Sequence, residues 1–315
     1  MPAKPFLTIE QQVKLLEKRG VATSDRTGPI LLREGYYSIV NGYKRPFIDE
    51  QASGKAGDDR YQPGTTFDSI YDLFSFDRSL REITFHYLIR AEATVRTAIS
   101  YCFADAHRSP DDYLLQSSFC TREEYESYGK DPDNYAEELT KLTGILGRRA
   151  KKSESEFVAH YRGRYGAIPI WVLANDLTFG NLEHFFNLMK PPEKIAVCKA
   201  ISTSTGRLGD RTLGFFDVNT ARVSLEVLVK FRNICAHDER LYCARVGGRK
   251  DVNYEKMLWM LERYLTRREF YVLLKELLEL FQDGLNNNRA VATVLEELGF
   301  MELQEEIMRR HAKAS

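Results

Sequence analysis

The sequence contains few cysteines, and they are scattered: only five occur among 315 residues. None forms a Cys-x-x-Cys pair and their number is odd, so a disulfide framework is not expected and a reduced cytosolic setting is the simplest interpretation. Cys235, His237 and Cys243 lie near one another in the chain, but their spacing fits no usual zinc pattern and a fourth ligand is missing. We therefore expect neither a metal nor another cofactor.

The sequence also lacks an excess of charge and a long apolar run. Forty-five basic residues balance forty-five acidic ones, so net charge gives no support for non-specific nucleic-acid binding, and any basic surface must be local. No uncharged stretch is long enough to span a bilayer, and the first residues lack the apolar core of a signal peptide. We expect a soluble, cytoplasmic protein without a membrane partner.

Strand-like alternation is nearly absent, whereas helical periodicity recurs along the chain. The longest example covers residues 67–106, where apolar residues recur over about nine helical turns without Pro or Gly. Residues 49–65 are rich in Gly and Asp, which predicts a surface loop and a boundary. The sequence thus predicts an all-α protein with a helical subdomain at 1–65 and a larger helical domain at 66–315.

One stretch, residues 220–242, organises the rest of the chain; we expect it to form a helix with Thr220 as N-cap. Apolar residues cover most of its surface, so the helix should be buried. One polar stripe runs down it, within a sector of about 80° on an ideal helix. The stripe consists of Arg222, Glu226, Lys230, Asn233 and His237. Such a stripe faces either water or a site.

Arg232 and His237 are the candidate reactive residues of this helix. They diverge by about 140° on an ideal helix, whereas Asn233 and His237 share a face. If the substrate is RNA, as the family resemblance described in the next paragraph implies, the 2′-OH beside each phosphate is an internal nucleophile, so cleavage needs proton transfer and positive charge but, in principle, no metal. His237 could act as acid or base, Arg232 could stabilise the phosphorane, and Asn233 could orient the phosphate or the imidazole. The alternative, favoured by spacing alone, is an arginine that caps or pairs and a histidine that hydrogen-bonds within the core.

Residues 232–237, Arg-Asn-Ile-Cys-Ala-His, resemble the Arg-x4-His signature of HEPN-superfamily ribonucleases. With Arg-Leu-Tyr following at 240–242, they are more similar to a block of the Abi family, the abortive-infection phage-resistance proteins. Three further blocks resemble that family, in its order: Gly-Tyr-Tyr and Asn-Gly-Tyr within 35–47, the charged helix 71–96, and Pro-x-Trp followed by Phe-Gly within 168–189. The resemblance implies a HEPN-like helical bundle with additional N-terminal and C-terminal helices.

The resemblance also implies a function: an endoribonuclease toxin of a phage-defence system, acting on RNA as a homodimer and in some cases restrained by another RNA. HEPN folds often carry a Glu-x3-Lys/Arg pair beside the catalytic helix, and Glu92 and Arg96 fit this pattern. From spacing alone this pair, like Asp77 and Arg81, is an ordinary ion pair on a solvated helix face.

Two further residues adjoin the motif. Asp238 stands where the family frequently has a second histidine, and it could pair with Arg240 or orient the imidazole of His237. Arg240 is therefore taken, with Asp238, as a supporting residue of the site.

A second basic region interleaves cations with aromatic residues, which suits an RNA strand through phosphate contacts and base stacking. Its cations are Arg148, Arg149, Lys151, Lys152, Arg162 and Arg164. The alternative is a solvated charged helix and loop, which the zero net charge favours. Two other functions compete with the nuclease: a non-catalytic RNA-binding phage-defence protein that uses the same cleft, and an inert helical scaffold.

Overall fold

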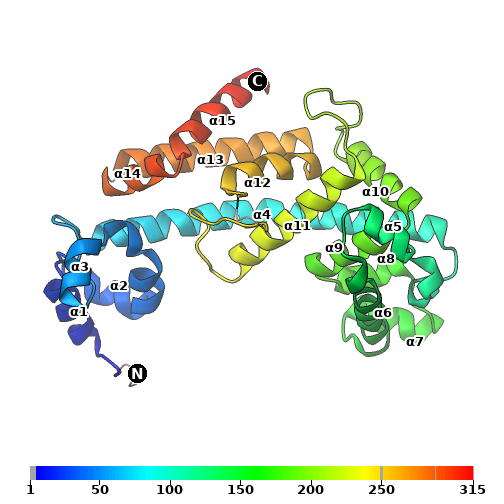
Figure 1. Ribbon diagram of the computed structural model, residues 1–315, viewed down its shortest axis with the longest axis horizontal. Coiled ribbons are helices and arrows are strands. Elements are labelled where there is room, and N and C mark those ends of the chain that lie inside the picture. The colour runs from blue at the N-terminus through cyan, green and yellow to red at the C-terminus, as the bar shows by residue number, and fades with distance from the viewer. Residues whose placement is uncertain (1–4, 249–250, 288, 315) are drawn as a thin grey trace. The chain divides into compact units, whose positions relative to one another are not determined.

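The computed structural model describes residues 5–248, 251–287 and 289–314, and it consists of helices joined by turns and short irregular segments (Figure 1). Within these residues no β-strand forms, and strand-like pairing is limited to isolated bridges. The expected all-α fold is therefore confirmed. The chain divides into two compact units, each built from segments that are distant in sequence. The expected boundary at residue 65 stays a prediction.

Unit 1 comprises Met1–Ile83, Arg240–Cys243 and Leu274–Ser315. Its helical segments are α1 (Ile9–Lys18), α2 (Thr27–Glu34), η1 (Tyr37–Asn41), η2 (Arg45–Phe47), α3 (Glu50–Ala56), α14 (Arg289–Glu297) and α15 (Phe300–Ala314), with residues 67–83 of α4 (Phe67–Ala106) and 274–287 of α13 (Arg267–Asn287). The sequence predicts one long helix or two nearly collinear ones over 67–106, and the structure forms a single helix there, α4. The loop expected over 49–65 is wrong where α3 forms, because the Asp49 carboxylate accepts the Ala52 amide at 2.9 Å and caps this helix.

Aromatic side chains fill the core of unit 1. The ring of Phe281 lies 6.2 Å from Phe76 and 5.3 Å from Phe300, centroid to centroid. Gly284 lies against this cluster: a Cβ there would come within 2.8 Å of the Phe76 ring. Only a glycine lets the α13 backbone approach the phenylalanine so closely.

A buried polar cluster also belongs to unit 1. Asp77 has no exposed surface, and its carboxylate accepts hydrogen bonds from Arg81 at 2.6 Å and from the Tyr43 hydroxyl at 2.6 Å. The backbone amides of Leu241 and Tyr242 donate to the same carboxylate at 3.1 Å and 2.6 Å. The solvated ion pair expected from the spacing of Asp77 and Arg81 is wrong, because α4 turns this face into the core.

Unit 2 comprises Thr84–Glu239 and Ala244–Leu273. Besides residues 84–106 of α4 and 267–273 of α13, its helical segments are η3 (Asp112–Leu114), η4 (Gln116–Ser118), α5 (Arg122–Ser127), η5 (Pro132–Asn134), α6 (Tyr135–Lys152), α7 (Glu156–Tyr165), α8 (Ile170–Leu173), η6 (Ala174–Asp176), α9 (Phe179–Leu188), α10 (Pro191–Ser204), α11 (Val218–Ala236), α12 (Tyr254–Leu261) and η7 (Glu262–Tyr264). Helix α11 packs against α9, α10 and α12, which places it at the centre of this unit.

Two buried hydroxyl pairs fix the helices around α11. Ser224 of α11 and Tyr264 share a hydrogen bond of 2.6 Å between their oxygens, and Thr84 of α4 and Tyr254 share one of 2.9 Å. Each tyrosine thereby satisfies its hydroxyl inside an apolar core, where an unpaired hydroxyl would be costly. The helix that carries the candidate motif is thus held rigidly.

Candidate functional site

Helix α11 begins three residues earlier than the sequence suggested. Asp217, not Thr220, is the N-cap: its carboxylate accepts the Thr220 amide at 2.9 Å and the Thr220 hydroxyl at 2.8 Å. The prediction of Thr220 as the cap was wrong because an aspartate three residues earlier competes for the same amide. These hydrogen bonds lower the pKa of Asp217, the Thr220 amide having the largest effect.

The apolar and polar faces of α11 follow the expected pattern. Leu225, Leu228 and Phe231 have no exposed surface. On the polar stripe, Lys230 donates to Glu226 at 2.6 Å, and both side chains are about two-fifths exposed, at 42% and 41%. The stripe therefore meets solvent at Glu226 and Lys230.

The helix ends in a left-handed turn at the motif. His237 is the C-cap, and its amide donates to the Asn233 carbonyl at 2.9 Å. The Glu239 amide reaches back to the Ile234 carbonyl at 3.0 Å, the long-range bond of a Schellman turn. Asp238, between them, has a φ of 56°, a conformation in which Asp, Asn and His are the favoured residues after Gly. The left-handed backbone therefore favours an aspartate at position 238, independently of any role of its carboxylate beside His237.

Arg232 is anchored on a buried carboxylate. Its Nε donates to Glu92 Oε2 at 3.3 Å, while Arg96 donates to Glu92 Oε1 at 2.9 Å. The Glu92 side chain is 7% exposed, but those of Arg232 and Arg96 are 27% and 24% exposed. Phe85 lies beneath the Arg232 guanidinium, 5.7 Å from its ring centroid. Two guanidinium groups on one carboxylate leave a net positive charge at the surface.

His237 and Asn233 are both exposed. In the part of the chain that the structure describes, the His237 ring makes no hydrogen bond, and the terminal nitrogens of Arg232 bind no acceptor. The alternative expected from spacing holds for the arginine, which pairs with Glu92, but not for the histidine, which lies outside the core. A guanidinium and an imidazole are therefore both open to an incoming anion.

The remaining supporting residues are placed differently. Asp238 forms the left-handed turn that follows His237. Arg240 belongs to unit 1, where its Nη1 donates to the Gly42 carbonyl at 3.0 Å. Phe85 was missed from the sequence, where its only signal is its position two helical turns before Glu92 on α4.

The six basic residues of the second region fall into two groups. Arg148, Arg149 and Lys152, at the end of α6, line a hollow of about 510 Å³ together with Thr178 and Asn181 at the start of α9. By contrast, Arg162 donates to the carbonyls of Lys151 and Ser153 and so closes the α6–α7 connection.

Lys151 itself is exposed, and the guanidinium of Arg164 lies 5.6 Å from the ring of its neighbour Tyr165. Only three of the six predicted cations are therefore brought together around one concave surface. Among the described residues, no group of three or more His, Cys, Asp or Glu side chains could hold a metal ion.

Fold and site together define a helical protein in which one buried helix ends in an exposed histidine, five residues after an arginine anchored on a buried carboxylate. The chain belongs to the family of Abi-like proteins, whose family model matches residues 29–243. Membership of this family indicates a part in abortive infection, a phage-defence response. Neither a curated protein nor a solved structure matches the chain. No helix among the described residues has the length and apolarity needed to cross a membrane.

Proposed function

We propose that this protein is a metal-independent endoribonuclease toxin of the HEPN type that acts in abortive infection. The observation that carries the proposal is the end of α11, where an exposed imidazole with no partner among the described residues follows an arginine whose guanidinium is fixed on buried Glu92. The guanidinium can bind an anionic backbone, and the imidazole can activate a nucleophile within the substrate. RNA has both features, because its phosphates are anionic and its ribose carries a 2′-OH.

In the proposed reaction His237 removes the proton of a ribose 2′-OH, and the 2′-oxygen attacks the adjacent phosphorus. The bond from phosphorus to the 5′-oxygen breaks, and that oxygen takes up a proton. The products are a 2′,3′-cyclic phosphate and a free 5′-OH. Arg232 stabilises the negative charge of the phosphorane, and Asn233 orients the phosphate or the imidazole.

Glu92 and Arg96 act as positioning residues in this proposal. Glu92 holds the Nε of Arg232, which fixes the plane of the guanidinium and leaves its terminal nitrogens for a phosphate. A pre-organised guanidinium loses less entropy when it binds than a mobile one. Asp238 supports the site through the turn that places His237, and Arg240 by holding the segment after that turn.

The basic hollow extends the proposed RNA path. A Cβ on Gly180 would lie 3.8 Å from Val229 of α11, so the start of α9 touches α11. Asn233 follows Val229 by one helical turn, about 6 Å along the axis. A single RNA strand with a phosphate at Arg232 can therefore continue toward the hollow, where Arg148 and Lys152 offer further phosphate contacts.

A homodimer completes the proposal. Cleavage needs a base and an acid, and the motif of one chain supplies a single histidine. A second copy that faces the first across a shared cleft would provide a second histidine, so that one histidine acts as the base and the other as the acid. Protein that is strictly monomeric at assay concentration and still cleaves RNA would contradict this part of the proposal.

The test is cleavage of total RNA by purified protein in the presence of a chelator, with the ends of the products mapped. We expect His237→Ala and Arg232→Ala each to lower the rate by about 10² to 10⁴. Lys230→Ala is the matched control, because it removes an exposed cation of the same stripe that pairs with Glu226. Loss of activity in all three variants alike would count against specific roles for the pair.

The second candidate function is a non-catalytic RNA-binding defence protein. It is supported by the same surface, since two partly exposed guanidinium groups and the basic hollow could hold an RNA without cutting it. The His237→Ala variant separates the two functions. If it still protects cells from phage, binding alone suffices; if protection and cleavage disappear while RNA binding persists, the nuclease is favoured.

A further inference from the structure

A cavity in unit 2 lies away from the candidate nuclease residues, at the opposite end of α11. It has a volume of about 860 Å³ and a mainly apolar lining. Its walls are α10, the connection between α10 and α11, the first residues of α11 and Arg263. This volume lies within the range of sites that bind small organic molecules.

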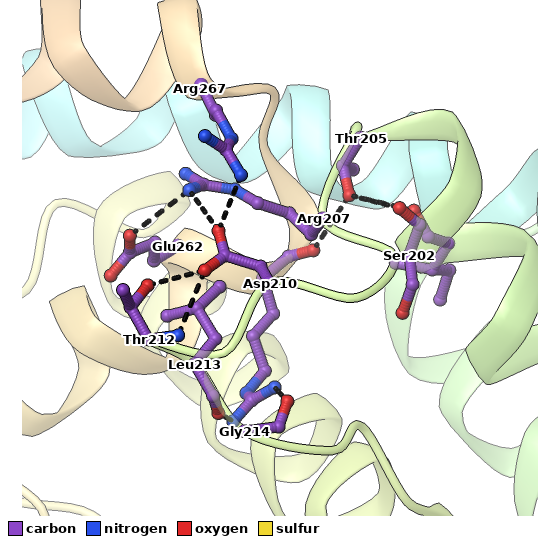
Figure 2. A network of polar contacts seen from close by, with 11 residues as sticks. Ser202, Thr205, Arg207, Asp210, Thr212, Leu213, Gly214, Glu262 and Arg267 are labelled. Atoms are coloured by element: carbon purple, nitrogen blue, oxygen red, sulfur yellow. Dashed lines mark hydrogen bonds and ion pairs between the residues drawn. The ribbon is translucent and has the colours of Figure 1, made fainter.

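The connection that walls the cavity is held in place by its own polar network, which Figure 2 shows. The amides of Arg207 and Leu208 donate to the Ser202 carbonyl at 2.8 Å and 2.9 Å. Asp210 accepts hydrogen bonds from Thr212, whose hydroxyl lies at 2.6 Å, and from Arg267 at 3.1 Å. The cavity is thus preformed, not a gap under a loose loop.

Arg263 fixes the far end of the same connection. It donates to the carbonyls of Leu213 and Gly214, and its guanidinium lies 5.4 Å from the Phe216 ring centroid. Next to these anchored residues the rim exposes apolar side chains. Phe215 is 85%, Leu208 59% and Ile195 57% exposed.

A buried donor at the wall lacks an acceptor. The side chain of Arg207 is 9% exposed, and its Nε is buried without a hydrogen-bond partner among the described residues. Its Nη1 makes only long ion pairs, at 3.5 Å to Asp210 and 3.5 Å to Glu262. A buried guanidinium nitrogen without an acceptor is costly, and Arg207 is one of the residues that line the cavity.

The charges around the cavity favour the same kind of ligand. Its two carboxylates are already engaged, Asp210 with the loop and Asp217 as the cap of α11. Hydrogen bonds from Thr212 lower the pKa of Asp210, so it remains ionised. Lys199 and Arg211 at the wall form no ion pair with the residues that the structure describes. The cavity therefore combines an apolar lining with uncompensated positive charge.

We propose that this cavity binds a small amphipathic anion, with an apolar body among the apolar walls and one acidic group at Arg207. An aliphatic carboxylic acid and an aromatic acid share this chemistry. A nucleotide does not, because its ribose and several phosphate charges would meet mainly apolar surface. The site is independent of the proposed nuclease reaction.

Two fluorescent probes that differ only in their acidic group test the proposal: anilinonaphthalene sulfonate, an anion, and phenylnaphthylamine, its neutral counterpart. We expect one anion site per chain and binding of the anion at least about tenfold tighter than that of the neutral probe. Arg207→Met should weaken the anion about tenfold and leave the neutral probe unchanged.

Because Arg207 also bridges two carboxylates, a second pair of variants avoids any effect on folding. Ile195 is exposed at the wall, and Ile195→Glu and Ile195→Gln differ only in charge. We expect the glutamate variant to bind the anion several-fold more weakly than the glutamine variant, with equal affinity for the neutral probe.

Competition then identifies the kind of anion. Displacement of the probe by dodecanoate or by naphthoate, but not by ATP, supports the proposal. Stronger displacement by dodecanoate indicates an aliphatic acid as the ligand, and stronger displacement by naphthoate indicates an aromatic acid. Equal binding of both probes, no difference between the two Ile195 variants, or displacement by ATP alone would overturn it.

Discussion

Helix α4 carries two carboxylate–guanidinium pairs with the same spacing, and the structure gives them opposite environments. Asp77 and Arg81, in unit 1, are 0% and 4% exposed, and every acceptor position of Asp77 is used by a protein donor. Glu92 is equally buried in unit 2, but its partners Arg96 and Arg232 reach solvent. We call the first group (Tyr43, Asp77 and Arg81) the closed cluster, because all its carboxylate acceptors are used. We call the second group (Glu92, Arg96 and Arg232) the open cluster, because guanidinium donors remain for a ligand.

The difference teaches that spacing does not separate a structural pair from a binding pair; the third partner does. Around Asp77 the additional donors are a buried tyrosine and two backbone amides, which leave no acceptor for a ligand. Around Glu92 the additional donor is a second guanidinium, which brings surplus charge. We therefore expect the closed cluster to govern stability and the open cluster to govern activity.

The largest effect should come from Asp77→Asn, which keeps the shape but removes the buried charge. Arg81 would then lose the Asp77 carboxylate as its partner in the core, and we expect the free energy of unfolding to fall by about 3 to 5 kcal/mol. Denaturant unfolding followed by circular dichroism measures this loss. Glu82→Gln, on an exposed position of the same helix, should change stability by less than about 0.5 kcal/mol.

A buried cation without a counter-ion gives a second comparison. Lys194 of α10 is 2% exposed and forms no ion pair with the described residues; its ammonium lies 4.3 Å from the Tyr128 ring centroid. Desolvation lowers its pKa from 10.5 to about 8. The unfolded chain therefore binds more protons than the folded one between these two values, and the contribution of Lys194 to stability rises with pH across that window.

Lys194→Met should consequently stabilise the protein most at pH 7, by up to about 3 kcal/mol, and the advantage should shrink as pH rises from about 8 to 10. Melting curves of both proteins across this range measure the difference, in which titration of other groups cancels. Lys199 is an exposed residue of the same helix, so the stability difference between Lys199→Met and the unaltered protein should not vary with pH. If the stability difference for Lys194→Met were also independent of pH, the ammonium of Lys194 would not be desolvated.

The open cluster is tested by Glu92→Gln. The amide can still accept one hydrogen bond, but it no longer neutralises either guanidinium, so we expect a stability loss of about 1 to 2 kcal/mol. If Glu92 positions Arg232, RNA cleavage per folded molecule should fall about tenfold with the affinity for RNA nearly unchanged. In Asp77→Asn, by contrast, the cleavage rate of the fraction that remains folded should match that of the unaltered protein.

Much of this architecture could be predicted from periodicity, as α4 shows, and much of the motif from residue type. What could not be predicted depends on contacts between distant segments. Asp77 is buried because residues 241 and 242 return to it, and Phe85 supports Arg232 across a long sequence separation. The wrong prediction of Thr220 as N-cap has a local cause. Asp217 and Thr220 are both capping residues, three positions apart, and only the backbone geometry shows that Asp217 is the cap.

The smallest effect concerns the turn that ends the site. Because Asp238 has a φ of 56°, Asp238→Gly should be neutral or stabilise by up to about 1 kcal/mol, whereas Asp238→Ala should cost about 1 kcal/mol. If the residue acts only through the backbone, the glycine variant will cleave RNA at the unaltered rate. A glycine variant that is fully stable but slow would instead show that the carboxylate itself works with His237. The site would then contain a second carboxylate besides Glu92 and would carry less surplus positive charge than Arg96 and Arg232 suggest.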